Sequence, residues 1–171
     1  MPSTLEFTQS CLILLAIKGM FSIDQLSKLL PLASEWAKQQ EDYITKNGIP
    51  LDDDQKIDAY LIGVDQIEKV RLLEVDKIPV PTIPELRKVV EYTGLLTPHT
   101  VGVTFRYGIY IRSDFWIRRN LVVHELTHTM QYERYGNVKR FLKYYLKECI
   151  EKGYPNGPLE LEARRIEKEI C

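Results

Sequence analysis

The stretch HELTH, residues 124–128, lies in the middle of a segment, residues 117–135, in which apolar side chains recur at helical spacing. Gly136 follows the segment directly and is a natural helix stop. We therefore predict one helix of about five turns that carries the whole stretch. Residues four apart in a helix project from the same face, so His124 and His128 are predicted to lie side by side.

The pattern H-E-x-x-H is typical of a hydrolytic zinc site. Two imidazoles one helical turn apart can share a zinc ion at Zn–N distances of about 2.0–2.1 Å. Glu125 follows the first histidine and is predicted to face the open coordination position, where it can take a proton from water. The alternative is a pair of structural core histidines. A glutamate in this mostly apolar segment is costly to bury without a partner, however, and a metal supplies one.

A catalytic zinc usually has three protein ligands, so a third must come from elsewhere in the chain. The extended pattern H-E-x-x-H-x-x-G-x-x-H is excluded, because Gln131 and Arg134 stand where it requires Gly and His. A later helix, predicted to begin at Pro158, offers two candidates. These are Glu160 and Glu162, which face different directions on that helix.

An H-E-L-T-H helix followed by a helix that opens P-x-E-x-E-A resembles the gluzincins, zinc metallopeptidases with two His and one Glu on the metal. Within that family the chain resembles small single-domain bacterial and archaeal members, including the minigluzincins, and the resemblance covers roughly residues 100–165. By position in that pattern, Glu160 corresponds to the third ligand, with Glu162 as the alternative. Many gluzincins place Asp or Asn four residues after this Glu, to accept the N–H of a ligand histidine. Arg164 stands there instead, so another acceptor is needed, such as a backbone carbonyl.

The resemblance implies zinc-dependent hydrolysis of peptide bonds in a peptide or protein substrate, with Glu125 as the general base. A second electrophile would stabilise the oxyanion. Tyr154 is the first candidate for that role, and the alternatives near it in sequence are Tyr132, Tyr135 and Arg164. The alternative function is a non-catalytic or latent zinc-bound fold that acts as a binding module. In a latent form, the thiol of Cys171 could occupy the open zinc position.

The remaining pattern predicts an α+β, zincin-like fold with about six helices and a small sheet of two or three strands before the active-site helix. Residues 100–105 and 108–112 are predicted to form a hairpin. In the resembled family, a strand at this place pairs with extended substrate. A further strand is expected at 68–75. One helix is expected to end near residues 18–19. A second is expected to start at a capping box of Ser22 with Gln25 and to break or kink at Pro31. Further helical segments are expected at 32–44, 52–63, 84–92 and 137–152.

Composition sets the outer limits. A chain of 171 residues is long enough for one compact domain, with residues 1–66 as a helical scaffold or cleft cover and residues 67–171 as the metallopeptidase core. The charge of −1 excludes a strong electrostatic footprint for nucleic acid, which also argues against a nucleic-acid-associated protease. Three widely spaced cysteines indicate no disulfide framework. The apolar run 11–17 is too short to span a membrane and lacks a basic leader, so we expect a cytoplasmic protein.

Overall fold

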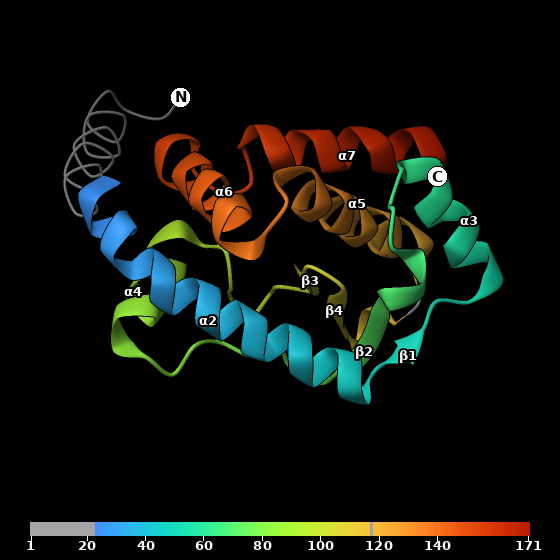
Figure 1. Cartoon of the computed structure of the whole chain (residues 1–171), viewed down its shortest axis with the longest axis horizontal. Coiled ribbons are helices and arrows are strands. Elements are labelled where there is room, and N and C mark those ends of the chain that lie inside the picture. The colour runs from blue at the N-terminus through green and yellow to red at the C-terminus, as the bar shows by residue number, and fades with distance from the viewer. Residues whose placement is uncertain (1–22, 117) are drawn as a thin grey trace, which may run out of the picture.

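The computed structural model describes residues 23–116 and 118–171 (Figure 1). Six α-helices lie in this part: α2 (Ile23–Asn47), α3 (Asp53–Ile62), α4 (Pro84–Thr93), α5 (Arg119–Tyr135), α6 (Val138–Lys152) and α7 (Pro158–Ile170). The strands are β1 (Ile49–Pro50), β2 (Arg71–Val75), β3 (Gly102–Phe105) and β4 (Gly108–Arg112). The α+β class is as predicted. The helix expected to end near residues 18–19 and the Ser22 capping box fall outside the described residues.

The sheet has four strands in the order β1-β2-β4-β3, one more than the sequence predicts. The extra strand is β1, which pairs antiparallel with β2 through Ile49 and Pro50. Two residues are too few to show an alternating pattern, so no sequence signal marks this strand. The predicted hairpin of β3 and β4 is antiparallel, whereas β2 pairs with β4 in parallel. This order makes β3 an edge strand.

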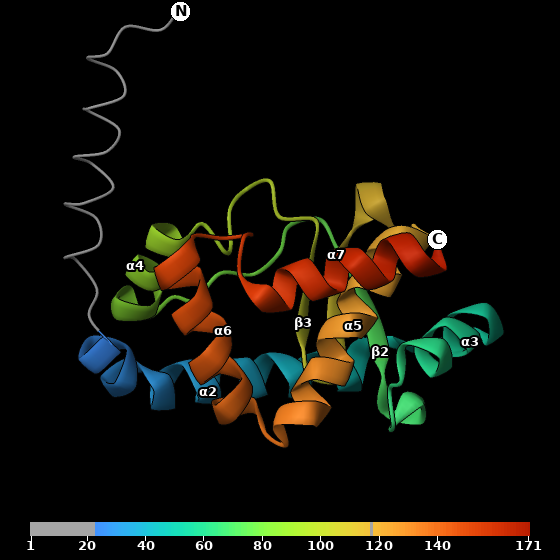
Figure 2. The same cartoon turned by 90° about the horizontal axis from the view of Figure 1, so that it is seen from above.

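Helices cover both faces of the sheet. Ile109 and Ile111 of β4 belong to a core cluster with Val122 and Leu126 of α5, whereas Tyr110 packs with Ile44 of α2. This alternation follows from the two-residue period of a strand. In Figure 1, α7 lies above α5, and α5 lies above the sheet. Figure 2 shows α3 and α4 at opposite ends of the molecule.

The N-terminal helices contribute to the same cores as the rest of the chain. Ala59 and Ile62 of α3 share a cluster with Val122 of α5, and Leu26 of α2 packs with Leu146 of α6. A boundary after residue 66 therefore runs through shared hydrophobic cores. Packing along its length also explains why α2 is not divided at Pro31, where the sequence predicts a break or kink. Tertiary contacts offset the roughly 3 kcal/mol that an interior proline costs a helix.

The predicted helix boundaries hold within one or two residues where clear caps are present. Asp52 forms a capping box with Gln55 at the start of α3, and Gly63 ends that helix in the left-handed conformation. The strand predicted at 68–75 is shorter, because residues 67–69 form a 3-10 turn before β2. No helix in the described ranges is long and apolar enough to cross a membrane.

Candidate metal centre

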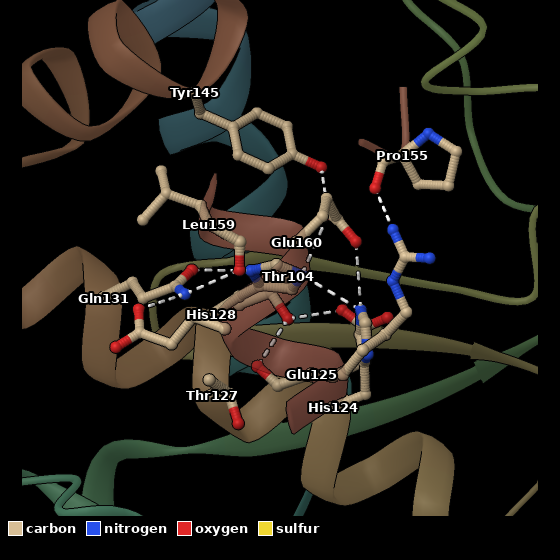
Figure 3. A network of polar contacts seen from close by, with 12 residues as sticks. Thr104, His124, Glu125, Thr127, His128, Gln131, Tyr145, Pro155, Leu159 and Glu160 are labelled. Carbon is tan, nitrogen blue, oxygen red and sulfur yellow. Dashed lines mark hydrogen bonds and ion pairs between the residues drawn. The ribbon is translucent and has the colours of Figure 1, made fainter. Parts of the chain in front are cut away.

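Two helices bring together the three residues proposed as metal ligands. His124 and His128 project from neighbouring turns of α5, and Glu160 lies in the first turn of α7, which packs along α5 (Figure 3). The Nε2 atoms of the two histidines are 3.2 Å apart. Glu160 Oε2 lies 3.3 Å from Nε2 of His124, and Glu160 Oε1 lies 3.2 Å from Nε2 of His128.

These distances fit a zinc ion. Tetrahedral zinc with bonds of about 2.0–2.1 Å places its ligand atoms about 3.3 Å apart. The two imidazole nitrogens are 3.2 Å apart, which agrees with that spacing, and each lies 3.2 or 3.3 Å from a different oxygen of Glu160. Two imidazole nitrogens and one carboxylate oxygen also form a donor set that zinc favours at catalytic sites. The arrangement can therefore hold zinc with one coordination position left for water or substrate.

The structure separates the two glutamates that the sequence leaves as alternatives. Glu160 faces the histidines, whereas Glu162 contacts Gln131 and Arg134 farther along α5. Both Glu162 oxygens lie 2.9 Å from Nη2 of Arg134, and Oε2 also accepts from Gln131 Nε2 at 2.9 Å. Glu162 thus contacts residues that surround the cluster but does not belong to it.

Side chains from three helices hold the cluster from outside. Glu167 Oε2 lies 3.3 Å from Nδ1 of His124, and Gln131 Oε1 lies 2.8 Å from Nδ1 of His128. The hydroxyl of Tyr145 donates to Glu160 Oε1 at 2.6 Å. Side chains therefore take the role for which the sequence suggests a backbone carbonyl. Helical spacing could have pointed to Glu167, seven residues after Glu160, whereas nothing local marks Tyr145, which comes from α6.

Glu125 is buried beside the histidines and faces strand β3. Its Oε2 accepts a hydrogen bond of 2.7 Å from the hydroxyl of Thr104, and its side chain lies against Gly102. Burial raises the pKa of Glu125, although the nearby histidines lower it in part. Gly102 and Thr104 are two residues apart on β3, so both face α5. The strand to which the family resemblance gives a substrate-binding role therefore also contacts the residue expected to act as the base.

The candidates for the second electrophile lie in different places. Tyr154 is 37% exposed and lies at the edge of the cluster, where it lines the same cavities as His124 and Glu125. Tyr132 is buried, and its hydroxyl donates to the carbonyl of Thr104 at 3.4 Å. The other two candidates have different contacts: Tyr135 stacks on Tyr144, and Arg164 donates to the carbonyl of Pro155.

The thiol of Cys171 does not reach the cluster. Cys171 is exposed at the C-terminal end of α7. Glu160 lies in the first turn of that helix, and a rise of 1.5 Å per residue places the two about 16 Å apart along the axis. The predicted latency through this thiol is therefore wrong for this arrangement of the chain.

Two hollows of different character meet at the cluster. An apolar cavity of about 100 Å³ lies between β3 and helices α2, α4 and α6, with Val89, Leu95 and Leu146 in its wall. A more open hollow of about 370 Å³ is lined by polar groups that include His99, Asn120 and Glu167. His124 and Glu125 border both hollows. A ligand that lies across the cluster would therefore contact an apolar hollow on one side and a polar hollow on the other.

Known proteins give no further guide to the site. No protein-family model, curated protein or solved structure matches the chain. What can be said of function therefore rests on the residues of the cluster and their geometry.

The cluster predicts that metal binding depends on pH. Burial by itself disfavours a charged imidazole, but the hydrogen bond and the charge of Glu160 prevail and raise the pKa of His128 to about 9. A metal ion that binds His128 must therefore displace a proton from the charged imidazole. We expect zinc affinity, measured by competition with a chelating dye, to rise about tenfold per pH unit between pH 6 and 8. An affinity that is constant over this range would contradict the prediction.

The pair of His128 and Glu160 also makes the stability of the metal-free fold depend on pH. The direction of that dependence follows from the two pKa shifts. Because the pKa of His128 is raised above its unfolded value, its contribution is complete below about pH 6.5 and is lost as pH rises through about 9. Desolvation opposes ionisation of Glu160, but hydrogen bonds from both histidines lower its pKa below the ordinary value. The contribution of Glu160 is therefore present above the ordinary carboxyl pKa and is lost in acid.

Gly102→Ala should selectively disturb the proposed base. A Cβ atom at this position would lie 2.8 Å from Glu125 Oε1 and 3.1 Å from its Cδ, so the carboxylate must move. Displacement of a catalytic group by about 1 Å can cost on the order of 100-fold in rate. If the cluster hydrolyses peptides, we expect kcat/KM to fall by at least about tenfold while zinc content stays at the wild-type level. Thermal unfolding serves as the control, and unchanged kcat/KM would show that Gly102 does not set the position of Glu125.

Proposed function

We propose that the chain is a zinc-dependent metallopeptidase of the gluzincin type. The observation that carries the proposal is the cluster of His124, His128 and Glu160, whose imidazole nitrogens each lie within 3.3 Å of a Glu160 oxygen and which lies beside a buried glutamate. If the histidines and Glu160 formed only an ion pair that stabilises the fold, the buried carboxylate of Glu125 beside them would have no role. Zinc held by these three residues would act as a Lewis acid on a peptide carbonyl and would lower the pKa of water.

Glu125 carries out the proton transfers in this proposal. It removes a proton from the attacking water and later delivers it to the leaving amine. Burial raises the pKa of Glu125, so its carboxylate is a stronger base than that of an exposed glutamate, which suits a group that must accept a proton. The hydroxyl of Thr104 holds one carboxylate oxygen in place and leaves the other free.

Tyr154 is the residue that we assign to the oxyanion. It borders both hollows together with Glu125, on a segment that precedes α7. Desolvation raises its pKa above the ordinary tyrosine value, so its hydroxyl remains protonated and can donate a hydrogen bond. Tyr132 cannot take this role without losing its contact with the Thr104 carbonyl.

Strand β3 supports a peptide as the substrate. Val101 accepts a hydrogen bond from Arg112, and in the antiparallel register Val103 opposite Tyr110 is the next hydrogen-bonded pair. The N–H and carbonyl of Gly102 therefore face away from β4, on the free edge of the sheet beside Glu125. An extended peptide could add to this edge through backbone hydrogen bonds that depend little on sequence.

The proposal is tested by measuring metal and activity on the same preparation. We expect elemental analysis to find about one zinc per chain in protein never exposed to a chelator. We also expect cleavage of casein or of a quenched peptide library that stops with a chelator and returns when zinc is added. Protein without a transition metal would contradict the proposal. A metal-loaded protein with no activity would favour the non-catalytic binding module.

A further inference from the structure

The amide of Gln131 has only one possible orientation. Its side chain is completely buried in α5, three residues after His128. Nε2 lies 2.9 Å from the carbonyl oxygen of Leu159 and 2.9 Å from Glu162 Oε2. A carbonyl oxygen can only accept, and both Glu162 oxygens already accept from Nη2 of Arg134. The atom between these acceptors must therefore be the NH₂ group, and the other must be the amide oxygen.

This orientation decides which nitrogen of His128 carries a proton. Gln131 Oε1 lies 2.8 Å from Nδ1 of His128 and can only accept, so Nδ1 must be the donor. A neutral imidazole has one N–H, so Nε2 keeps its lone pair. In the metal-free protein the second proton of a charged ring must therefore lie on Nε2, which is 3.2 Å from Oε1 of Glu160 and 3.2 Å from Nε2 of His124. This is the proton that a metal ion displaces, and its loss leaves the lone pair on the nitrogen that faces the cluster.

We propose that Gln131 is a positioning residue for the metal centre, and that the Leu159 carbonyl and Glu162 fix the orientation of its amide. The inference rests on the metal site of the proposed function but does not require peptidase activity. Leu159 directly precedes Glu160, so one amide holds both a ligand histidine and the backbone next to the ligand glutamate. Glu162 thereby acquires a role, although it is not a ligand.

The first test compares zinc affinities at fixed pH by competition with a chelating dye. Gln131→Met keeps the approximate volume but removes the acceptor for His128, and we expect affinity to fall about 10–100-fold. The matched control is Thr129→Val, which removes a hydrogen bond from a buried neighbour on α5 to the Arg106 carbonyl. We expect this control to bind zinc within about twofold of wild type. Equal losses in both variants would overturn the proposal.

A pair of substitutions tests the orientation without changing side-chain size. Gln131→Glu keeps an acceptor for His128 but places a carboxylate against two acceptors, so we expect affinity to fall by about tenfold. Adding Glu162→Gln supplies a donor to that carboxylate and should recover most of the loss. A packing defect would not be repaired in this way. A double variant that binds zinc no better than the single one would overturn the proposed network.

Nuclear magnetic resonance gives a readout that does not depend on zinc. In ¹⁵N-labelled metal-free protein, the Nδ1–H of His128 should give a signal protected from exchange with water. Gln131→Met should remove that protection, and Thr129→Val should not. An unprotected signal in the wild type would overturn the role of Gln131. If the wild type binds no zinc, the proposed function fails, and this signal alone decides whether Gln131 orients His128.

Discussion

Glu125→Gln should keep zinc and the fold while reducing peptide hydrolysis by at least about 10²–10⁴-fold, the usual contribution of a general acid–base group. Glutamine retains the size of the side chain and one acceptor oxygen, so the hydrogen bond from Thr104 can persist. It cannot take up a proton at neutral pH. Because Glu125 acts twice in the proposed cycle, the loss should lie at the upper end of this range.

The measurement is turnover of casein or a quenched peptide by wild type and variant at equal zinc occupancy. Thermal unfolding and zinc content are measured on the same samples to show that the fold and the metal are retained. Equal turnover in both proteins would refute the role of Glu125. Absence of turnover in both, after a broad substrate screen, would favour the alternative of a zinc-bound fold that does not hydrolyse peptides.

Removing any one of the three ligands should largely abolish zinc binding. If the ligands share a binding free energy of about 10 kcal/mol, each contributes about 3 kcal/mol, which is roughly 100-fold in affinity. We therefore expect His124→Ala, His128→Ala and Glu160→Ala each to weaken zinc binding by at least about 100-fold. The readout is zinc content after gel filtration, together with a titration against a chelating dye.

Glu162→Ala is the matched control for the third ligand. It removes a carboxylate from the same helix, two residues away, that contacts Gln131 and Arg134 but not the cluster. Its effect acts through Gln131, so we expect a loss of about tenfold at most. The reverse order, with Glu162→Ala the more damaging of the two, would show that Glu160 is not the ligand.

The helices and the pair of histidines could be predicted from sequence because their signals are local. The i, i+4 spacing of His124 and His128 fixes their common face once a helix forms. Caps such as Asp52 and Gly63 mark where α3 begins and ends. The resemblance to the gluzincins favours Glu160 over Glu162, and in the structure it is Glu160 that faces the histidines.

The features that could not be predicted from the sequence depend on contacts between segments that are far apart in the chain. Strand β1 exists because β2 is there to pair with it, and its two residues carry no pattern of their own. Tyr145 reaches Glu160 only because α6 packs beside α7. The separation of Cys171 from the cluster follows from the direction of α7, which carries the thiol away from Glu160. Such features require the whole fold.

If the chain binds zinc as proposed, the division of the ligands between α5 and α7 would link the metal supply to the lifetime of the protein. His128 and Glu160 meet only when the two helices are packed, so an unfolded chain offers a far weaker site. Free zinc at 100 times the dissociation constant would add about 2.7 kcal/mol to the free energy of unfolding. In a zinc-starved cell the same chain would unfold more often and would be degraded sooner, so its abundance would follow zinc availability without any dedicated sensor.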